Sequence, residues 1–326
     1  MRLDLEGVHA AWRLDLGGAT AFVVVHAAPG RRSFGGIRVR AYPDDAAALT
    51  DARRLAEAMT RKVLLAGLPA GGAKTVVRVP ARGWDEAARR AGMERLGAFV
   101  ESLGGLYHCG ADLGFTDDDE AAVRRATAHV GARSLGPLTA RSVLVALDAV
   151  CAPASVAVQG LGVVGSRVAA DLVARGVAVD GADVDAAAAR SVEGVRVVAP
   201  ETVAHAACDV FSPCAAGGVL DAATIARLRC RVVCGGANNP FAEDADADRL
   251  HARGITYVPD VLANAGAVIG GASLALGEPE RTDARIAALA DTVREVLARA
   301  AREDRSPHHV VRELADALLA EALARG

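Results

Sequence analysis

The sequence predicts an α/β protein with two domains around a cleft, an α/β substrate and oligomerisation domain and a Rossmann-type domain. Three observations lead to this prediction. The chain has 326 residues, enough for about two domains of roughly 150 residues each. Short apolar runs alternate with amphipathic helical segments. A G-x-G-x-x-G fingerprint at residues 160–165 stands between a predicted strand and a predicted helix.

The first predicted elements are a strand and a long helix. Residues 21–26 (AFVVVH) are rich in β-forming side chains. Residues 44–65 repeat apolar side chains at three- and four-residue spacing, which predicts an amphipathic helix. Asp44 or Asp45 is expected to cap its start, and Gly67 to end it.

A glycine-rich turn over residues 70–73 and a strand over 75–79 are predicted next, followed by a helix over 84–103. Residues 103–119 are rich in Gly and Asp and predict an irregular loop, the kind of segment that often carries function. Thr139 is then expected to cap a helix over residues 140–150.

Short apolar runs dominate the second half and suit a parallel sheet that is buried on both faces. A helix over 166–174 follows the glycine fingerprint. The tail predicts an amphipathic helix over 285–302 and a last helix opened by Ser306 and Pro307. The predicted strands cover 156–158, 177–182, 195–198, 210–212, 232–234 and 256–258.

Composition excludes several classes of protein. The net charge of −3 and 52% hydrophobic residues argue against a disordered chain and against binding to nucleic acid or to a membrane surface. No apolar run reaches the roughly 18 residues that span a bilayer, and the N-terminus has no signal-peptide pattern. The six cysteines form no C-x2-C pair, so no metal site is expected. We therefore expect a cytoplasmic protein.

The glycine fingerprint predicts binding of NAD. Gly160 allows the tight turn, Gly162 lets the backbone approach a pyrophosphate, and Gly165 permits close packing of helix on strand. Asp183 ends the next strand, where a carboxylate accepts hydrogen bonds from ribose hydroxyls and repels a 2′-phosphate. Asp185 is the alternative for this position. The carboxylate favours NAD over NADP.

Lysine usage gives a second functional signal. Only two of the 37 basic residues are lysines, Lys62 and Lys74, and they lie twelve positions apart. Arginine stays charged, whereas a buried lysine can lose its proton. A lysine that occurs in a chain whose other basic residues are all arginines therefore suits proton chemistry. With Asp112 they suit amino-acid chemistry: one lysine anchors a substrate carboxylate, the other acts as acid and base, and the carboxylate handles an amine. Two ordinary surface lysines and a loop aspartate would give the same pattern.

Several motifs together resemble the glutamate/leucine/phenylalanine/valine dehydrogenases. They include a lysine helix, a glycine-rich segment before the second lysine, an aspartate loop, a P-x-T hinge segment and the coenzyme turn. In order, the similar segments are 59–62, 68–74, 110–114, 137–140, 158–162, 209–215, 236–239 and 257–266.

The resemblance implies roles for individual residues. Lys62 would bind the substrate α-carboxylate, Lys74 would activate the water that attacks an imine, and Asp112 would move protons to and from the amine. The backbone at Gly36 and the side chain of Asn264 would help to hold the substrate. The implied reaction is NAD-dependent oxidative deamination of an L-amino acid to a 2-oxo acid and ammonium, and its reverse.

The resemblance also implies coenzyme contacts. Thr139 and Asn238 would contact the nicotinamide or its ribose. Val164 lies in the glycine fingerprint, and Cys214 and Ala215 lie in the similar segment 209–215; all three are expected to contact the coenzyme.

Substrate choice rests on four positions in this resemblance. Phe34 stands where glutamate-specific relatives have a lysine, so a hydrophobic substrate is expected, because an unpaired buried carboxylate is costly. Gly110, Val268 and Gly271 align with the walls of the pocket. Glycine at position 110 favours an aromatic over a branched-chain substrate.

The sequence departs from the family pattern at four positions: Val63, Ala73, Ala111 and Gly270. None of these changes removes a catalytic group.

The expected substrate domain covers residues 1–137, with the C-terminal helix 296–326 packed back on it, and the expected NAD-binding domain covers 138–295. Relatives form homo-oligomers through the first domain, so a dimer or larger assembly is expected. Two alternatives stay open: a catalytically silent NAD-binding or regulatory homologue, and another Rossmann dehydrogenase with a similar first domain.

Overall fold

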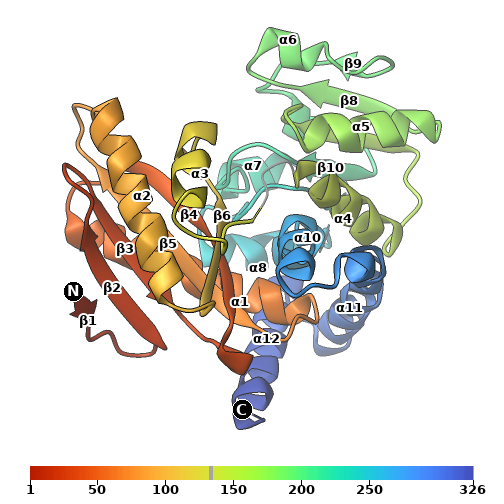
Figure 1. Ribbon diagram of the computed structural model, residues 1–326. Helices are drawn as coiled ribbons and strands as arrows, with labels where there is room; N and C mark the ends of the chain where they lie inside the picture. The colour runs from red at the N-terminus through yellow and green to blue at the C-terminus, as the bar shows by residue number, and fades with distance from the viewer. Residues whose placement is uncertain (132–134, 326) are drawn as a thin grey trace. The chain divides into compact units, whose positions relative to one another are not determined.

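The computed structural model describes residues 1–131 and 135–325, and over this part of the chain two compact units are formed. Each unit is built on one sheet flanked by helices (Figure 1), which confirms the predicted α/β class. Unit 1 contains residues 1–131, 268–280 and 315–325, and unit 2 contains 135–267 and 281–314. The domain limits expected from the sequence stay a prediction.

Within residues 1–131, unit 1 has a six-stranded sheet in the order β1-β2-β3-β5-β4-β6. The pairs β1–β2, β2–β3 and β3–β5 are antiparallel, whereas β4 runs parallel to both β5 and β6. The strands are β1 (Arg2–Leu3), β2 (Ala10–Asp15), β3 (Thr20–Val25), β4 (Ser33–Ala41), β5 (Gly71–Val79) and β6 (Tyr107–Ala111).

Helices cover both faces of this sheet (Figure 1). Phe22 and Val24 of β3 pack with α1 (Asp45–Leu65), while Val23 and Val25 pack with α2 (Glu86–Ser102) on the other face. Since successive side chains of a strand point to opposite faces, this double burial explains the continuous apolar run of β3.

The helix predicted over residues 44–65 is confirmed. The Asp44 side chain caps α1 by accepting a hydrogen bond from the Ala47 N–H at 2.8 Å. Gly67 follows the helix with φ +68°, a conformation that glycine adopts without strain.

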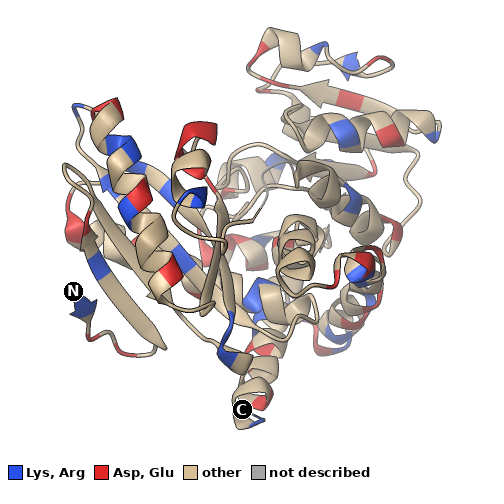
Figure 2. Cartoon of the chain, viewed as in Figure 1, with Lys and Arg blue, Asp and Glu red and all other residues tan. Residues whose placement is uncertain are grey.

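Two expectations for the first half are wrong. Residues 103–119 are not one irregular loop, because they contain β6 and the start of α3 (Asp117–Arg124). The short strand β6 is stabilised by its parallel pairing with β4. Acidic residues at the start of α3 stabilise that helix, because they lie at the positive end of its dipole (Figure 2). The glycine-rich turn is also part of a strand, since β5 begins at Gly71.

Glycine is required at the start of β5 for packing. A Cβ at Gly71 would lie 1.9 Å from the Ala27 carbonyl oxygen, and one at Gly72 would lie 2.0 Å from the Thr60 nitrogen. The segment after β3 and the end of α1 therefore approach the backbone of β5 directly.

Across residues 135–267, unit 2 has a six-stranded parallel sheet in the order β12-β11-β10-β7-β8-β9. The chain passes outward from β7 through β8 and β9, then continues on the other side of β7 with β10. This reversal is the topological switch point at which doubly wound sheets bind ligands. The strands are β7 (Ser155–Gln159), β8 (Ala178–Ala182), β9 (Arg196–Val197), β10 (Val210–Pro213), β11 (Val232–Val233) and β12 (Thr256–Tyr257).

The six strands predicted for the second half are confirmed, but the expected cap at Thr139 is wrong. Helix α4 (Gly136–Asp148) has Pro137 in its first turn, so Thr139 lies inside the helix. The other helices are α5 (Gly165–Ala174), α6 (Ala186–Ala189), α7 (Ala222–Arg227), α8 (Asp244–Ala252), α9 (Asp260–Ala263), α10 (Gly266–Ala275), α11 (Thr282–Glu303) and α12 (Pro307–Ala324).

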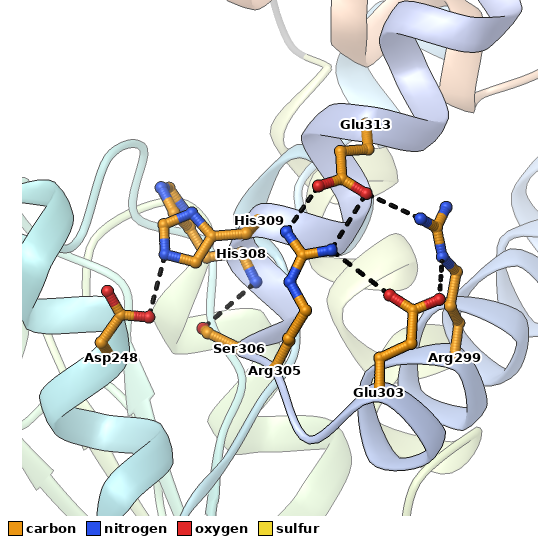
Figure 3. A network of polar contacts seen from close by, with 8 residues as sticks. All are labelled: Asp248, Arg299, Glu303, Arg305, Ser306, His308, His309 and Glu313. Atoms are coloured by element: carbon orange, nitrogen blue, oxygen red, sulfur yellow. Dashed lines mark hydrogen bonds and ion pairs between the residues drawn. The ribbon is translucent and has the colours of Figure 1, made fainter.

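A network of charged side chains joins the end of α11 to the start of α12 (Figure 3). Arg299 contacts both Glu303 and Glu313 at 2.7 Å. His309 lies 3.0 Å from Asp248 of α8. Such exposed pairs each contribute little stability, but together they favour one position for the start of α12.

We predict that Arg89→Ala lowers the free energy of unfolding by about 3 kcal/mol, because it leaves a buried charge without its partner. Arg89 donates from Nε to Asp119 Oδ1 at 2.7 Å, and the Asp119 side chain is only 2% exposed. Urea unfolding followed by circular dichroism measures the change.

Arg125→Ala is the matched control in the same part of the unit. Its ion pair with Glu94 is exposed on both sides, so a loss of at most about 0.5 kcal/mol is expected. Equal losses for the two variants would contradict the argument from burial.

Candidate active site

A buried ion pair lies on the sheet of unit 1. Lys74 Nζ on β5 contacts Asp112 Oδ2 at 2.8 Å, and the Lys74 side chain is only 7% exposed. Asp112 directly follows β6. The structure thus brings together two of the three residues that the sequence singled out for amino-acid chemistry.

The loop that carries Asp112 is held against β4. The Val39 N–H donates to the Leu113 carbonyl at 2.8 Å. Gly114 adopts φ +77°, and a Cβ there would lie 2.0 Å from the Val39 carbonyl oxygen. Backbone contacts therefore fix the loop on which the carboxylate sits.

Glycine at position 36 makes room for the ion pair. A Cβ added to Gly36 would lie 2.9 Å from Asp112 Cβ and 3.0 Å from Lys74 Nζ. Any side chain at this position would push against both groups. The Gly36 backbone therefore borders the ion pair directly.

Electrostatics set the charge of the pair. Burial alone would raise the pKa of Asp112, but Lys74 and Arg38 outweigh it and hold that pKa at about 2. Burial lowers the pKa of Lys74 below its ordinary value, although Asp112 opposes this. Asp112 is therefore ionised at neutral pH, and Lys74 gives up its proton more readily than an exposed lysine.

Lys62 lies in the last turn of α1 and is half-buried. Two residues earlier, the Thr60 hydroxyl accepts a hydrogen bond from the Gly72 N–H at 3.0 Å. The end of α1 is thus attached to β5 two residues before Lys74. This attachment explains how a helix and a strand can each supply a lysine to one region.

The residues expected to form the pocket walls lie on three elements of unit 1. Phe34 is buried on β4 and packs on His108 of β6, with ring centroids 5.3 Å apart. At Gly110, also on β6, no atom of the described residues lies within 4 Å of an added Cβ, so this part of the sheet is open. Val268 and Gly271 lie three positions apart on α10 and share one face of it.

The glycine fingerprint of unit 2 connects β7 to α5. Gly160 adopts φ +88°, and a Cβ at Gly165 would lie 1.8 Å from the Gly160 carbonyl oxygen. By contrast, among the described residues nothing lies within 4 Å of a Cβ built at Gly162. The turn is therefore closed where strand and helix meet and open where a phosphate would approach. Val164, the N-cap residue of α5, follows the open position.

Asp183 is tied to this turn. Its Oδ2 accepts a hydrogen bond from the Leu161 N–H at 2.7 Å, and its Oδ1 accepts one from the Asp185 N–H at 2.9 Å. These two bonds fix the carboxylate at the carboxyl end of β8, beside the fingerprint.

The neighbouring strand β10 supplies the other side of the switch point. The Cys214 N–H donates to the Gln159 carbonyl at 2.7 Å, and a Cβ at Gly160 would lie 2.8 Å from Ala215 Cβ. Burial raises the pKa of the Cys214 thiol, which therefore stays protonated.

Asn264 presents a buried acceptor. Its Nδ2 donates to the carbonyls of Gly236 and Ala237 and, at 3.0 Å, to Asn238 Oδ1. These acceptors fix the orientation of the amide. Its Oδ1 is buried and has no hydrogen-bond partner in the part of the chain that the structure describes. An unpaired buried acceptor is costly, so a donor from a ligand would stabilise it.

Thr139 lies at the start of α4, near the turn before α10. A Cβ at Gly266 would lie 1.8 Å from the Leu138 carbonyl oxygen, so α4 and the start of α10 touch by their backbones. The Ser142 hydroxyl reinforces this by donating to the Ala263 carbonyl at 2.7 Å.

These features fit a dinucleotide. The open backbone at Gly162 and the start of α5 suit a pyrophosphate, and the fixed carboxylate of Asp183 suits ribose hydroxyls. In residues 1–131 and 135–325, no group of three or more His, Cys, Asp or Glu side chains could hold a metal ion. No helix of the same residues is long and apolar enough to cross a membrane.

Arg38, which the sequence did not single out, also contacts the ion pair. Its Nε donates to Asp112 Oδ2 at 2.9 Å. Strand alternation was an available signal, because residues 34, 36 and 38 of one strand share a face. Arginine is so frequent in this chain that residue type alone gave no reason to select it.

Two family models match the chain. The one described as Glu/Leu/Phe/Val dehydrogenase, dimerisation domain, matches residues 7–127, and the one described as Glutamate/Leucine/Phenylalanine/Valine dehydrogenase matches residues 178–274.

Curated relatives and one solved structure are also amino acid dehydrogenases. Leucine dehydrogenase of Bacillus cereus is 33% identical over 86% of this chain and 81% of that protein. L-tryptophan dehydrogenase of Nostoc punctiforme is 31% identical over 91% of this chain and 88% of that protein. Its crystal structure has a TM-score of 0.84 at 28% identity and covers 97% of both chains. Phenylalanine dehydrogenase of Caldalkalibacillus thermarum is 32% identical over 77% of this chain and 74% of that protein.

We predict that alanine affects stability at one glycine of the fingerprint and dinucleotide binding at another. Gly165→Ala forces a Cβ into the Gly160 carbonyl and lowers the free energy of unfolding by about 3 kcal/mol. Gly162→Ala fills open space, so stability changes by less than about 0.5 kcal/mol while dinucleotide binding weakens. Thermal unfolding and fluorescence titration with NADH measure the two effects. Unchanged NADH affinity in the stable Gly162→Ala variant would contradict the assignment of this turn.

Proposed function

Because the chain belongs to the glutamate/leucine/phenylalanine/valine dehydrogenase family and is an amino acid dehydrogenase, we propose that it catalyses NAD-dependent oxidative deamination of a hydrophobic L-amino acid, and the reverse reductive amination. The products are the 2-oxo acid, ammonium, NADH and a proton. The observation that carries this proposal is the buried contact between Lys74 Nζ and Asp112 Oδ2.

In this proposal the substrate is held by its polar groups. The ammonium of Lys62 anchors the α-carboxylate, and Asp112, ionised at neutral pH, accepts a hydrogen bond from the substrate amine. Gly36 leaves its backbone accessible beside the reacting carbon. Asn264 Oδ1 accepts a further hydrogen bond from the bound substrate.

The proton steps use Lys74. Held at the turn of Gly160, Gly162 and Gly165, NAD would supply the acceptor for a hydride from the substrate Cα, and the substrate would then be an imine. Lys74, with a pKa lowered by burial, takes a proton from water as the water adds to the imine carbon. The proton held by Lys74 passes by way of Asp112 to the nitrogen, the added hydroxyl gives its proton back to Lys74 as the carbonyl forms, and the carbon–nitrogen bond breaks to release ammonia. Exclusion of bulk water around these groups strengthens each contact.

The coenzyme site proposed for unit 2 follows its geometry. The turn of Gly160, Gly162 and Gly165 holds the pyrophosphate, and Asp183 accepts from the ribose hydroxyls and disfavours a 2′-phosphate. A preference for NAD over NADP is expected. The remaining proposed coenzyme contacts are Thr139, Val164, Cys214, Ala215 and Asn238.

Substrate choice rests on the apolar pocket proposed above. The buried ring of Phe34 offers no partner for a side-chain carboxylate, whose burial without one would be costly. The open space at Gly110 favours a large side chain. Val268 and Gly271 complete the proposed walls. An aromatic or branched-chain amino acid is therefore the expected substrate, and the relatives described above are named for leucine, tryptophan and phenylalanine.

We also propose a homo-oligomer of two or more subunits in the cytoplasm. The match of residues 7–127 to a family model described as a dimerisation domain supports the assembly. The first part of the chain would then supply both the subunit contacts and the substrate site, and residues 138–295 the coenzyme site.

The test is a panel of L-amino acids assayed by NADH absorbance. Leucine, valine, phenylalanine and tryptophan are each offered with NAD and separately with NADP. We expect reduction of NAD with at least one of these substrates, and turnover of glutamate at least about 100-fold lower, because its side-chain carboxylate would be buried unpaired.

The outcomes separate the parts of the proposal. Glutamate as the best substrate would overturn the argument from Phe34, and equal use of NADP would overturn the argument from Asp183. No reduction of either coenzyme, by protein that still binds NADH, would overturn the catalytic proposal.

A further inference from the structure

A second basic side chain touches the carboxylate that holds Lys74. Arg38 lies on β4, its side chain is 17% exposed, and its Nε donates to Asp112 Oδ2 at 2.9 Å. Lys74 Nζ reaches the same oxygen at 2.8 Å. Two cations therefore converge on one carboxylate oxygen.

Arg38 is itself held from its other side. Its Nη1 donates to Asp51 Oδ2 on α1 at 3.2 Å. Asp51 also accepts from the Tyr42 hydroxyl at 2.6 Å and from Arg54 at 2.9 Å. The guanidinium thus bridges two carboxylates, one on α1 and one on the loop after β6. Its planar group of donors suits this geometry, which a single ammonium cannot reproduce.

We propose that Arg38 is a positioning residue for the reaction: by bridging Asp51 to Asp112, it fixes the carboxylate that holds Lys74 and supplies positive charge next to that lysine. This inference rests on the proposed function of Lys74 as a base. Arg38 touches neither reacting atom, so it acts through Asp112.

The charges that surround Lys74 determine the expected effects. The groups that face it are Asp112 from the loop after β6, Arg38 from β4 and Asp51 from α1, with Tyr42 and Arg54 behind Asp51. Burial is the largest influence and lowers the pKa of Lys74, Asp112 raises it, Arg38 lowers it and Asp51 raises it. Removal of Arg38 and neutralisation of Asp51 must therefore move the pKa of Lys74 in opposite directions.

The activity follows the neutral form of Lys74, whose fraction increases as the pH rises through its pKa. Arg38→Gln raises this pKa, so the rising limb of kcat/KM for oxidative deamination moves to higher pH by about one unit. Asp51→Asn lowers the pKa and moves the limb to lower pH. Arg38→Lys keeps the charge but not the bridge, so it keeps the midpoint close to wild type while kcat falls.

Arg78→Gln is the matched control. Arg78 lies on β5, and its Nε pairs with Asp45 of α1 at 2.7 Å, much as Arg38 pairs with Asp51. Neither Arg78 nor Asp45 is among the largest influences on the pKa of Lys74 or of Asp112. This variant should leave the midpoint in place, even where it lowers stability.

A second readout does not depend on activity. The chain has only two lysines, so 13C-lysine labelling gives two sets of Cε signals by NMR, which a Lys62→Arg variant assigns. The Lys74 signal should titrate at higher pH in Arg38→Gln and at lower pH in Asp51→Asn than in wild type. If Arg38→Gln does not fold, the titration of Lys74 in Asp51→Asn alone tests the proposal.

Failure of the proposed function can be distinguished from failure of the role proposed for Arg38. Wild-type protein without dehydrogenase activity would overturn the proposed function, while the NMR titration would still test the contact. An unmoved Lys74 titration in Arg38→Gln and Asp51→Asn, or shifts in the same direction, would overturn the role of Arg38.

Discussion

The contact between Lys74 and Asp112 is the interaction on which the proposed chemistry depends. A lysine buried in a sheet would be too costly to keep charged without a partner, and a carboxylate buried alone would take up a proton. Their 2.8 Å contact resolves both problems, and it leaves a lysine whose pKa is below its ordinary value beside a carboxylate that stays ionised. In the proposed mechanism, this one arrangement would provide both a proton acceptor and a site for a substrate amine.

Three glycines permit the close approaches of the backbone around this contact. Gly36 lacks a side chain where Lys74 and Asp112 need the space, and Gly114 lets the aspartate loop lie against β4. Gly72 lets the end of α1, which carries Lys62, pack against β5, which carries Lys74. These glycines lose more conformational entropy on folding than other residues do, which is the cost of backbones that approach so closely.

Part of this arrangement was predictable from the sequence, and the reasons differ by residue. The fingerprint and the two lysines stand out because the chemistry restricts residue type and spacing, and the strands of the second half follow from their apolar runs. The start of β5 and the position of β6 depend on pairing with β4, a long-range contact that local composition does not encode. Arg38 belongs to an abundant residue type, and its role depends on contacts with Asp51 and Asp112 that only the folded chain creates.

The most direct test of the role of Lys74 is chemical rescue of a Lys74→Ala variant. If Lys74 is the base that activates water, turnover of the best amino acid should fall by about 100- to 10,000-fold, and small primary amines in the buffer should restore part of it. NADH binding should be unchanged, since unit 2 holds the proposed coenzyme site. Turnover within about tenfold of wild type, or a loss that no amine restores although the variant is folded and binds NADH, would contradict this role.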